Sequence, residues 1–542
     1  MRESTRRLRS IFVVVGLIFF LGCVQEEKQT QVQSPTIKNL ILIIGDGMGP
    51  QQIGLLLTYA QLAPNSVIKD RVTAFEKMMD KGVLGIAMSY TANTLVADSA
   101  ASSTQIASGV YAGSEMVGLD QNGNPVETIL EKAKKIGKST GLISDNRVTH
   151  ATPAGFAAHQ PHRSLESEIA VDMLNTGPDI MLSGGLRSWI PKEANDQASS
   201  IRKELEELTE GNIQIESTRK DSRNLVDEAI KKGYAVAFNK SQMEKANGKI
   251  LGLFAYSSLP DGIRETRTKN SPDRTIPTLK EMSAKALTVL SQNENGFFLM
   301  IEAGQIDTAA HYHDTGTMLH EMLKINEILE YVLGWAKNHE DTLIVVTADH
   351  ETGGFGFSYS AYNIPKAIAL PGSGFKASDF QPNFNFGKAE ILDRLYNQQI
   401  SYDDIFFNIF DNLSEEDQTP SKLAEIVNQH TDFKITEEQA IKILATEENP
   451  FYVEGHQYLY SKTVPKMEVM GAFFPYQMDD NRQNLLAREV AESQNVVWST
   501  GTHTNTPVMV FALGPEKAMF QFKGFLHHVK IGQYLIDVLE TN

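Results

Sequence analysis

The feature that most constrains the fold of this chain is a series of short apolar runs, each of which stops abruptly at polar or glycine residues. Uniformly apolar strands are buried on both faces, as in a parallel or mixed sheet. Helical patterns lie between several runs, at residues 127–135, 279–290 and 318–337. This alternation predicts an α/β fold, a three-layer α/β/α sandwich with a central, mostly parallel sheet. The runs lie at residues 40–44, 141–143, 179–182, 297–301, 343–347 and 507–512.

The residues that follow these runs are the first indication of function. Asp46, Glu302 and the pair Asp349-His350 each begin within two residues of the end of an apolar run, and ligands gather at the carboxyl ends of strands in such sheets. Oxygen ligands from Asp46 and Glu302 would suit Mg²⁺. Asp307 and His311 are four residues apart, which places both on one face of a helix and suits Zn²⁺. Taken alone, a surface Asp-His pair explains that spacing better.

One serine stands among small residues, in Asp98-Ser99-Ala100, at the expected start of a helix. The positive end of a helix favours an alkoxide by up to about 2 kcal/mol. That is too little to make a hydroxyl reactive, so Ser99 would need a neighbouring base or a divalent metal ion. The alternative is an ordinary helix start with Asp98 as its N-cap, because capping sequences are common.

Composition and charge exclude several classes of protein. The chain has 542 residues, of which 41% are apolar and 22% charged, so a disordered or fibrous protein is excluded. Its formal net charge is -17, whereas domains that bind nucleic acids are usually basic; no specific nucleic acid binding is expected. A site for an anionic substrate must overcome this charge locally, with metal ions or arginine.

The N-terminus has the pattern of an export signal. Arg6, Arg7 and Arg9 precede an apolar run at residues 11–21 that is too short to span a bilayer. The run ends at Leu21-Gly22-Cys23, which resembles a bacterial lipobox and holds the only cysteine. We therefore predict a signal peptide over residues 1–22, a lipidated Cys23, and a membrane-anchored lipoprotein in the periplasm or at the cell surface. A plain signal peptide or an uncleaved anchor is the alternative. Residues 23–38 are expected to form a flexible tether.

Six motifs, in this order along residues 40 to 515, resemble those of the alkaline phosphatase family. The resemblance implies the fold of that family, hydrolysis of phosphate monoesters and, since dimers are common among its members, a homodimer. The motifs are Asp46-Gly47-Met48-Gly49, Asp98-Ser99-Ala100, His150-Ala151-Thr152-Pro153, Glu302-Ala303-Gly304 with Asp307 and His311, Asp349-His350-Glu351-Thr352-Gly353-Gly354, and Gly501-Thr502-His503-Thr504.

The resemblance also implies a role for each site residue. Ser99 would be the nucleophile that is transiently phosphorylated, and Arg163 would clamp the phosphate through its planar fork. His150 is expected to lie beside the magnesium ion without binding it. The metal ligands would be Asp307, His311 and His503 for one zinc ion, Asp46, Asp349 and His350 for a second, and Asp46, Thr152 and Glu302 for magnesium.

The rest of the chain can be divided more coarsely. Residues 39–542 are predicted to form one catalytic domain. Residues 191–248 are expected to form a peripheral helical excursion. Residues 357–480 are irregular apart from a helical pattern at 436–445, and are interpreted as a large insertion near the active face.

Two other functions remain open at this point. A phosphodiesterase or nucleotide pyrophosphatase of the same superfamily would share the two-zinc core, but Thr152, Glu302 and Arg163 favour a monoester, which presents more free charge. A surface lipoprotein that binds phosphate without turnover fits the tether and the lipobox equally well. It leaves Ser99 unexplained, because binding alone needs no nucleophile.

Overall fold

The computed structural model describes residues 37–376, 378–467, 473–478 and 481–540. The predicted signal peptide, the lipidated Cys23 and nearly all of the predicted tether lie outside the described residues. None of the helices described in these ranges is both long enough and apolar enough to cross a membrane.

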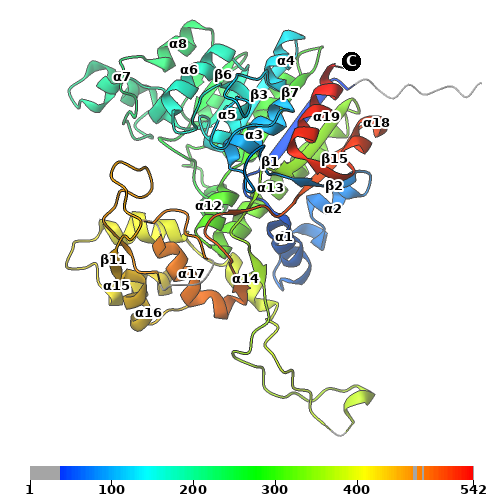
Figure 1. Ribbon diagram of the computed structural model, residues 1–542, viewed down its shortest axis with the longest axis vertical. Coiled ribbons are helices and arrows are strands. Elements are labelled where there is room, and N and C mark those ends of the chain that lie inside the picture. Colours follow the sequence, from blue (N-terminus) through cyan, green and yellow to red (C-terminus); the bar gives the residue numbers. More distant parts are fainter. Residues whose placement is uncertain (1–36, 377, 468–472, 479–480, 541–542) are drawn as a thin grey trace, which may run out of the picture. The chain divides into compact units, whose positions relative to one another are not determined.

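The core is a ten-stranded sheet with the strand order β16-β2-β15-β8-β1-β7-β3-β4-β6-β5 (Figure 1). In this sheet, β15 runs antiparallel to its neighbours β8 and β2, and the other paired strands are parallel. The strands are β1 (Asn39–Gly45), β2 (Val83–Met88), β3 (Ser139–Arg147), β4 (Ile180–Gly184), β5 (Ala235–Ala237), β6 (Ile250–Leu253), β7 (Phe297–Ala303), β8 (Thr342–Ala348), β15 (Val508–Leu513) and β16 (Gly524–His527).

The register of the central strands brings their carboxyl ends level. Every residue of β1, β7 and β8 is buried, as expected for strands that are covered on both faces. Gly45, the last residue of β1, pairs with Ala303 on one side and with Ala348 on the other. On β3, Ser144 pairs with Glu302. The residues that follow these strands therefore meet at one edge of the sheet.

Two groups of helices pack against the sheet and complete the three-layer α/β/α sandwich that the sequence predicts (Figure 1). One group consists of α1 (Pro50–Leu62), α2 (Ala74–Met79), α11 (Leu279–Leu290) and α13 (Thr315–Ala336). The other consists of α3 (Ser99–Ser108), α4 (Ile129–Lys135), α5 (Ala151–Ala157) and α19 (His528–Glu540). The other α-helices described between residues 37 and 311 are α6 (Glu166–Thr176), α7 (Ser200–Leu208), α8 (Leu225–Lys231), α9 (Lys240–Lys245), α10 (Gly262–Thr268) and α12 (Gln305–His311).

The segment 357–480 is more regular than its sequence indicates. The predicted helical piece corresponds to α16 (Glu437–Leu444), and α14 (Glu390–Tyr396) and α15 (Pro420–His430) precede it. Phe406, Leu423 and Phe433 are buried within this segment. Figure 1 shows α15 and α16 gathered with α17, next to α14. The other α-helices and strands described after residue 350 are α17 (Asn481–Gln494), α18 (Glu516–Met519) and the short strands β9 (Glu351–Thr352), β10 (Gly356–Phe357), β11 (Thr446–Glu448), β12 (Thr463–Pro465), β13 (Val496–Val497) and β14 (His503–Thr504).

Candidate active site

Three acidic or histidine side chains meet where β1 and β8 end. Asp46 follows β1, and Asp349 and His350 follow β8. The Nε2 atom of His350 lies 3.5 Å from Oδ1 of Asp46 and 3.2 Å from Oδ2 of Asp349. The backbone amides of Gly47 and His350 donate hydrogen bonds to the other Asp349 oxygen, at 3.0 and 2.9 Å. These three residues form one group that could hold a metal ion, and they are the residues that the sequence analysis expects around a second zinc ion.

A second group lies beside the first and draws on distant parts of the chain. Asp307 and His311 are on α12, where Nε2 of His311 lies 3.1 Å from Oδ2 of Asp307. His503 is brought in by pairing of β14 with β9, in which it stands opposite Thr352. Its ring stacks on that of His350 at a centroid distance of 3.5 Å, and its Nε2 lies 3.7 Å from Oδ1 of Asp307.

The histidine rings in this second group are oriented by backbone carbonyl groups. The Nδ1 atom of His311 lies 2.7 Å from the carbonyl oxygen of Gly501, and that of His503 lies 3.1 Å from the carbonyl oxygen of Ala97. A proton on Nδ1 leaves the lone pair of Nε2 free for a metal ion, and this is how metal-binding histidines are commonly held. The two Nε2 atoms are 3.2 Å apart. Asp307, His350 and His503 have ligand atoms close enough together to hold one ion.

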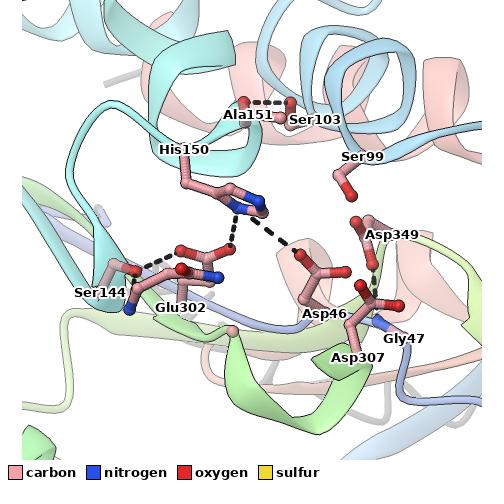
Figure 2. A network of polar contacts seen from close by, with 12 residues as sticks. Asp46, Gly47, Ser99, Ser103, Ser144, His150, Ala151, Glu302, Asp307 and Asp349 are labelled. Carbon is pink, nitrogen blue, oxygen red and sulfur yellow. Dashed lines mark hydrogen bonds and ion pairs between the residues drawn. The ribbon is translucent and has the colours of Figure 1, made fainter. Parts of the chain in front are cut away.

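A third group joins Asp46 to Glu302 and His150 (Figure 2). The Nδ1 atom of His150 lies 3.7 Å from Oε1 of Glu302 and 4.0 Å from Oδ2 of Asp46. Ser144 donates a hydrogen bond to the other Glu302 oxygen. The predicted ligand Thr152, the second residue of α5, lies close enough to Glu302 for its side chain to affect the pKa of that carboxyl group, and its hydroxyl is buried without a hydrogen-bond partner in the described chain.

The hydrogen bond from Arg163 decides which His150 nitrogen carries a proton. An Nη atom of Arg163 lies 3.2 Å from Nε2 of His150. Because a guanidinium only donates, Nε2 must accept and the proton of the neutral ring sits on Nδ1. Burial lowers the pKa of His150 well below its ordinary value, so the ring is neutral. In this tautomer Nδ1 faces Glu302 and Asp46 as a donor and has no lone pair for a cation.

The carboxylate oxygens in these groups fit bound cations. Both oxygens of Asp46, one of Glu302 and one of Asp349 are buried and have no hydrogen-bond partner in the described part of the chain. Such atoms are costly unless they are paired or bind a metal. Burial, with repulsion from nearby carboxylates, raises the pKa of Asp46 well above its ordinary value and that of Asp349 to about 7. Burial also raises the pKa of Glu302 to about 7. The donor set therefore fits divalent cations, with histidine and carboxylate ligands for zinc and oxygen ligands for magnesium.

Ser99 is the first residue of α3 and points into this cluster. Asp98 caps the helix, since its side chain accepts hydrogen bonds from the backbone amides of Ala100 and Ala101. The Oγ atom of Ser99 lies 3.1 Å from Nε2 of His350. Asp98 is therefore the N-cap that the alternative interpretation of the sequence expects. The same helix start places Ser99 at the positive end of α3, beside the predicted metal ligands.

Arg163 completes the constellation from the side of α5. One Nη atom lies 3.1 Å from Oδ2 of Asp98. Although burial acts against it, this carboxylate raises the pKa of the Arg163 guanidinium, so the charge is permanent. Ser99, Arg163, Asp307, His311 and His503 line a cavity of about 490 Å³. A larger hollow, of about 930 Å³, lies beside α13 and contains none of these residues.

The structure brings the ten predicted catalytic and metal-binding residues to one edge of the sheet, and adds others that the sequence analysis missed. Tyr476 stacks on His311 with a centroid distance of 3.6 Å, and no sequence pattern marks it. Thr352 donates a hydrogen bond to Asp307. Its place in the motif that follows Asp349-His350 is the signal that could have identified it.

Comparisons with known proteins agree with this geometry. The family model for alkaline phosphatase matches residues 37–541. The repressible alkaline phosphatase of Saccharomyces cerevisiae is 27% identical over 570 residues, covering 100% of this chain and 88% of the relative. Alkaline phosphatase 3 of Bacillus subtilis is 27% identical over 558 residues, covering 100% and 99%. The crystal structure of a cold-active alkaline phosphatase from the psychrophile Shewanella sp. is 26% identical, with a TM-score of 0.65 over 92% of this chain and 99% of that one. That of Thermus thermophilus alkaline phosphatase, 24% identical, shares the fold with a TM-score of 0.71 over 95% and 94%. The chain therefore belongs to the alkaline phosphatase family and is a phosphate monoester hydrolase.

Proposed function

We propose that this phosphatase acts through Ser99 in a site that holds two zinc ions and one magnesium ion. The observation that carries the proposal is the set of buried carboxylate oxygens without hydrogen-bond partners around Ser99. Bound divalent cations would neutralise the phosphoryl group and lower the pKa of oxygen nucleophiles beside them. The proposed ligands are Asp307, His311 and His503 for one zinc ion, Asp46, Asp349 and His350 for the other, and Asp46, Thr152 and Glu302 for magnesium, with His150 beside it.

The reaction we propose consists of two displacements at phosphorus. In the first, a bond forms between the Ser99 oxygen and phosphorus, the bond from phosphorus to the alcohol oxygen breaks, and the alcohol takes up the proton that Ser99 loses. Arg163, anchored by Asp98, is placed to hold two non-bridging oxygens with its fork. In the second, water attacks phosphorus, the bond between phosphorus and the Ser99 oxygen breaks, and Ser99 takes up a proton that the water loses as phosphate leaves. Preorganised positive charge at the developing negative charge is the main source of rate enhancement in such transfers.

A comparison of a monoester with a diester tests the choice against the phosphodiesterase alternative. We expect one preparation to hydrolyse p-nitrophenyl phosphate at least about tenfold faster than bis-p-nitrophenyl phosphate. The reason is that a monoester offers more free charge to Arg163 and the cations, and tenfold corresponds to about 1.4 kcal/mol. Rates are measured by release of p-nitrophenol. Faster turnover of the diester would overturn the proposal.

We also propose that the chain is exported and anchored through Cys23, with residues 39–542 as the catalytic domain and 357–480 as an insertion at the active face. Tyr458 and Tyr476, both from this segment, line hollows at the site, which supports the placement of the insertion.

For the anchor, we expect the full chain expressed in a bacterium to incorporate labelled palmitate and to sediment with membranes. The Cys23→Ala variant should lose the label. Equal labelling of both chains would exclude Cys23 as the lipid site.

A further inference from the structure

A second hollow adjoins the cavity at Ser99. It has a volume of about 650 Å³, and Arg147, His150, Arg163 and Tyr476 line both hollows. A substrate whose phosphoryl group lies at Ser99 and Arg163 would therefore have its leaving group next to this second space. We call the second hollow the arginine pocket, after side chains that line it: Arg147, Arg163, Arg187, Arg482, Tyr458 and Tyr460.

The arginine pocket carries more positive charge than its carboxylates balance. Glu166 is the one acidic residue in its described lining, and it is shared: Arg147 and Arg187 each donate to it at 3.1 Å. These two arginines lower the pKa of Glu166 to about 2 against the effect of burial, so it is ionised. One carboxylate cannot neutralise two guanidinium groups. A local surplus of positive charge in a chain of formal net charge -17 marks a place for an anion.

The other arginines do not remove this surplus. Arg163 pairs with Asp98 and Arg482 with Asp411, so four guanidinium groups face three carboxylates when these outside partners are counted. In addition, Nε of Arg187 is buried and has no hydrogen-bond partner in the described residues. A buried donor of this kind is unfavourable unless something binds it.

Aromatic rings also form part of the pocket wall. Tyr458 and Tyr460 line the pocket, and the ring of Tyr458 lies 6.1 Å from that of Tyr476. Phe407 also lines the pocket, with the Arg482 guanidinium 5.9 Å from its ring centre. Such a wall can pack against the organic part of a ligand while the arginines bind its charge.

We infer that the arginine pocket binds the leaving group, and that the enzyme prefers phosphate monoesters whose leaving group carries a second anionic group. The inference rests on the proposed function, because the phosphoryl group must occupy Ser99 and Arg163 for the leaving group to reach Arg187. A carboxylate or a second phosphate would accept hydrogen bonds from the Arg187 fork. Arg187 acts here as a specificity-determining residue and takes no part in the displacement at phosphorus.

The test compares pairs of substrates in which only one member carries a carboxylate on its leaving group. The 3-phosphoglycerate ion and glycerol 3-phosphate differ by a carboxylate, as do 4-carboxyphenyl phosphate and phenyl phosphate. In the metal-loaded enzyme we expect kcat/KM to favour the acidic member of each pair. In the Arg187→Gln variant this ratio should fall about tenfold, mainly through KM of the acidic substrate, as expected for loss of a charged hydrogen bond. Rates on glycerol 3-phosphate and phenyl phosphate, which lack the carboxylate, should stay near those of the wild type.

Two further variants make the result decisive. Arg482→Gln, which changes another arginine of the pocket lining, should also lower the ratio, so the inference can still be tested if Arg187→Gln does not fold. Arg202→Gln removes a half-buried arginine that pairs with Glu206 and is absent from the pocket lining, and it should leave the ratio unchanged. Equal kcat/KM for both members of each pair in the wild type, or an unchanged ratio in the folded pocket variants, would overturn the inference while leaving the phosphatase reaction intact. Failure of the wild-type enzyme to turn over the two substrates that lack the carboxylate would instead count against the proposed function.

Discussion

Replacing Ser99 with alanine is expected to lower kcat for p-nitrophenyl phosphate by at least about 10⁴-fold, because the variant cannot form the covalent intermediate. Ser99 is buried at the start of α3, with its Oγ 3.1 Å from Nε2 of His350. The cations and Arg163 do not depend on this hydroxyl, so phosphate should still bind. The measurements are turnover, competitive inhibition by phosphate, and acid-quenched labelling with a ³²P-substrate in a single turnover.

Ser102→Ala is the matched control for this prediction. Ser102 lies one turn further along α3, is fully buried, and its hydroxyl has no hydrogen-bond partner in the described chain. We expect this variant to keep its label and to retain turnover within about threefold of the wild type, since no reacting group is changed. More than a tenth of wild-type turnover in Ser99→Ala, or an acid-stable label in that variant, would reject Ser99 as the nucleophile.

The strands at the centre of the sheet are the ones that the sequence predicts most clearly, whereas β6 was missed although all 4 of its residues are buried. β1, β7 and β8 form the centre of the sheet and stand out as continuous apolar runs. β2 was missed because its residues alternate between buried and exposed positions. β16, at the edge of the sheet, was missed because it contains Phe525, which is 90% exposed. Edge strands are covered on fewer sides, so they carry less of the hydrophobic signal from which strands are predicted.

The site divides in the same way between local and long-range features. Asp46 and Asp349 could be predicted because each directly follows a buried strand, and the level register of β1 and β8 brings them together. The position of His503 depends on pairing between β14 and β9, two strands of only two residues each. Neither strand has a pattern that predicts its partner, so only the family resemblance identified this residue.

Replacing Asp46 with asparagine is expected to have the second largest effect, because one carboxylate serves two of the metal groups. We expect elemental analysis to find up to two fewer ions per chain, and activity to fall by about 10³-fold. The melting temperature should change in opposite directions in the metal-free and the metal-loaded protein. Burial and neighbouring carboxylates raise the pKa of Asp46, so the ionised side chain destabilises the metal-free fold and asparagine should raise its melting temperature. With zinc and magnesium present, the variant should melt below the wild type, since it gains less from binding.

The control is Asp179→Asn, at the amino-terminal ends of the parallel strands, away from the metal groups. Asp179 precedes β4 and accepts a hydrogen bond from the backbone amide of Thr140 at 2.8 Å, so its loss should cost some stability without changing the metal content. Full metal content and activity in Asp46→Asn would contradict the assignment of Asp46 to both ions. A buried carboxylate that serves only to bind cations destabilises the fold when the cations are absent. Reduced activity together with a lowered melting temperature of the metal-free variant would therefore show that Asp46 stabilises the fold without metal.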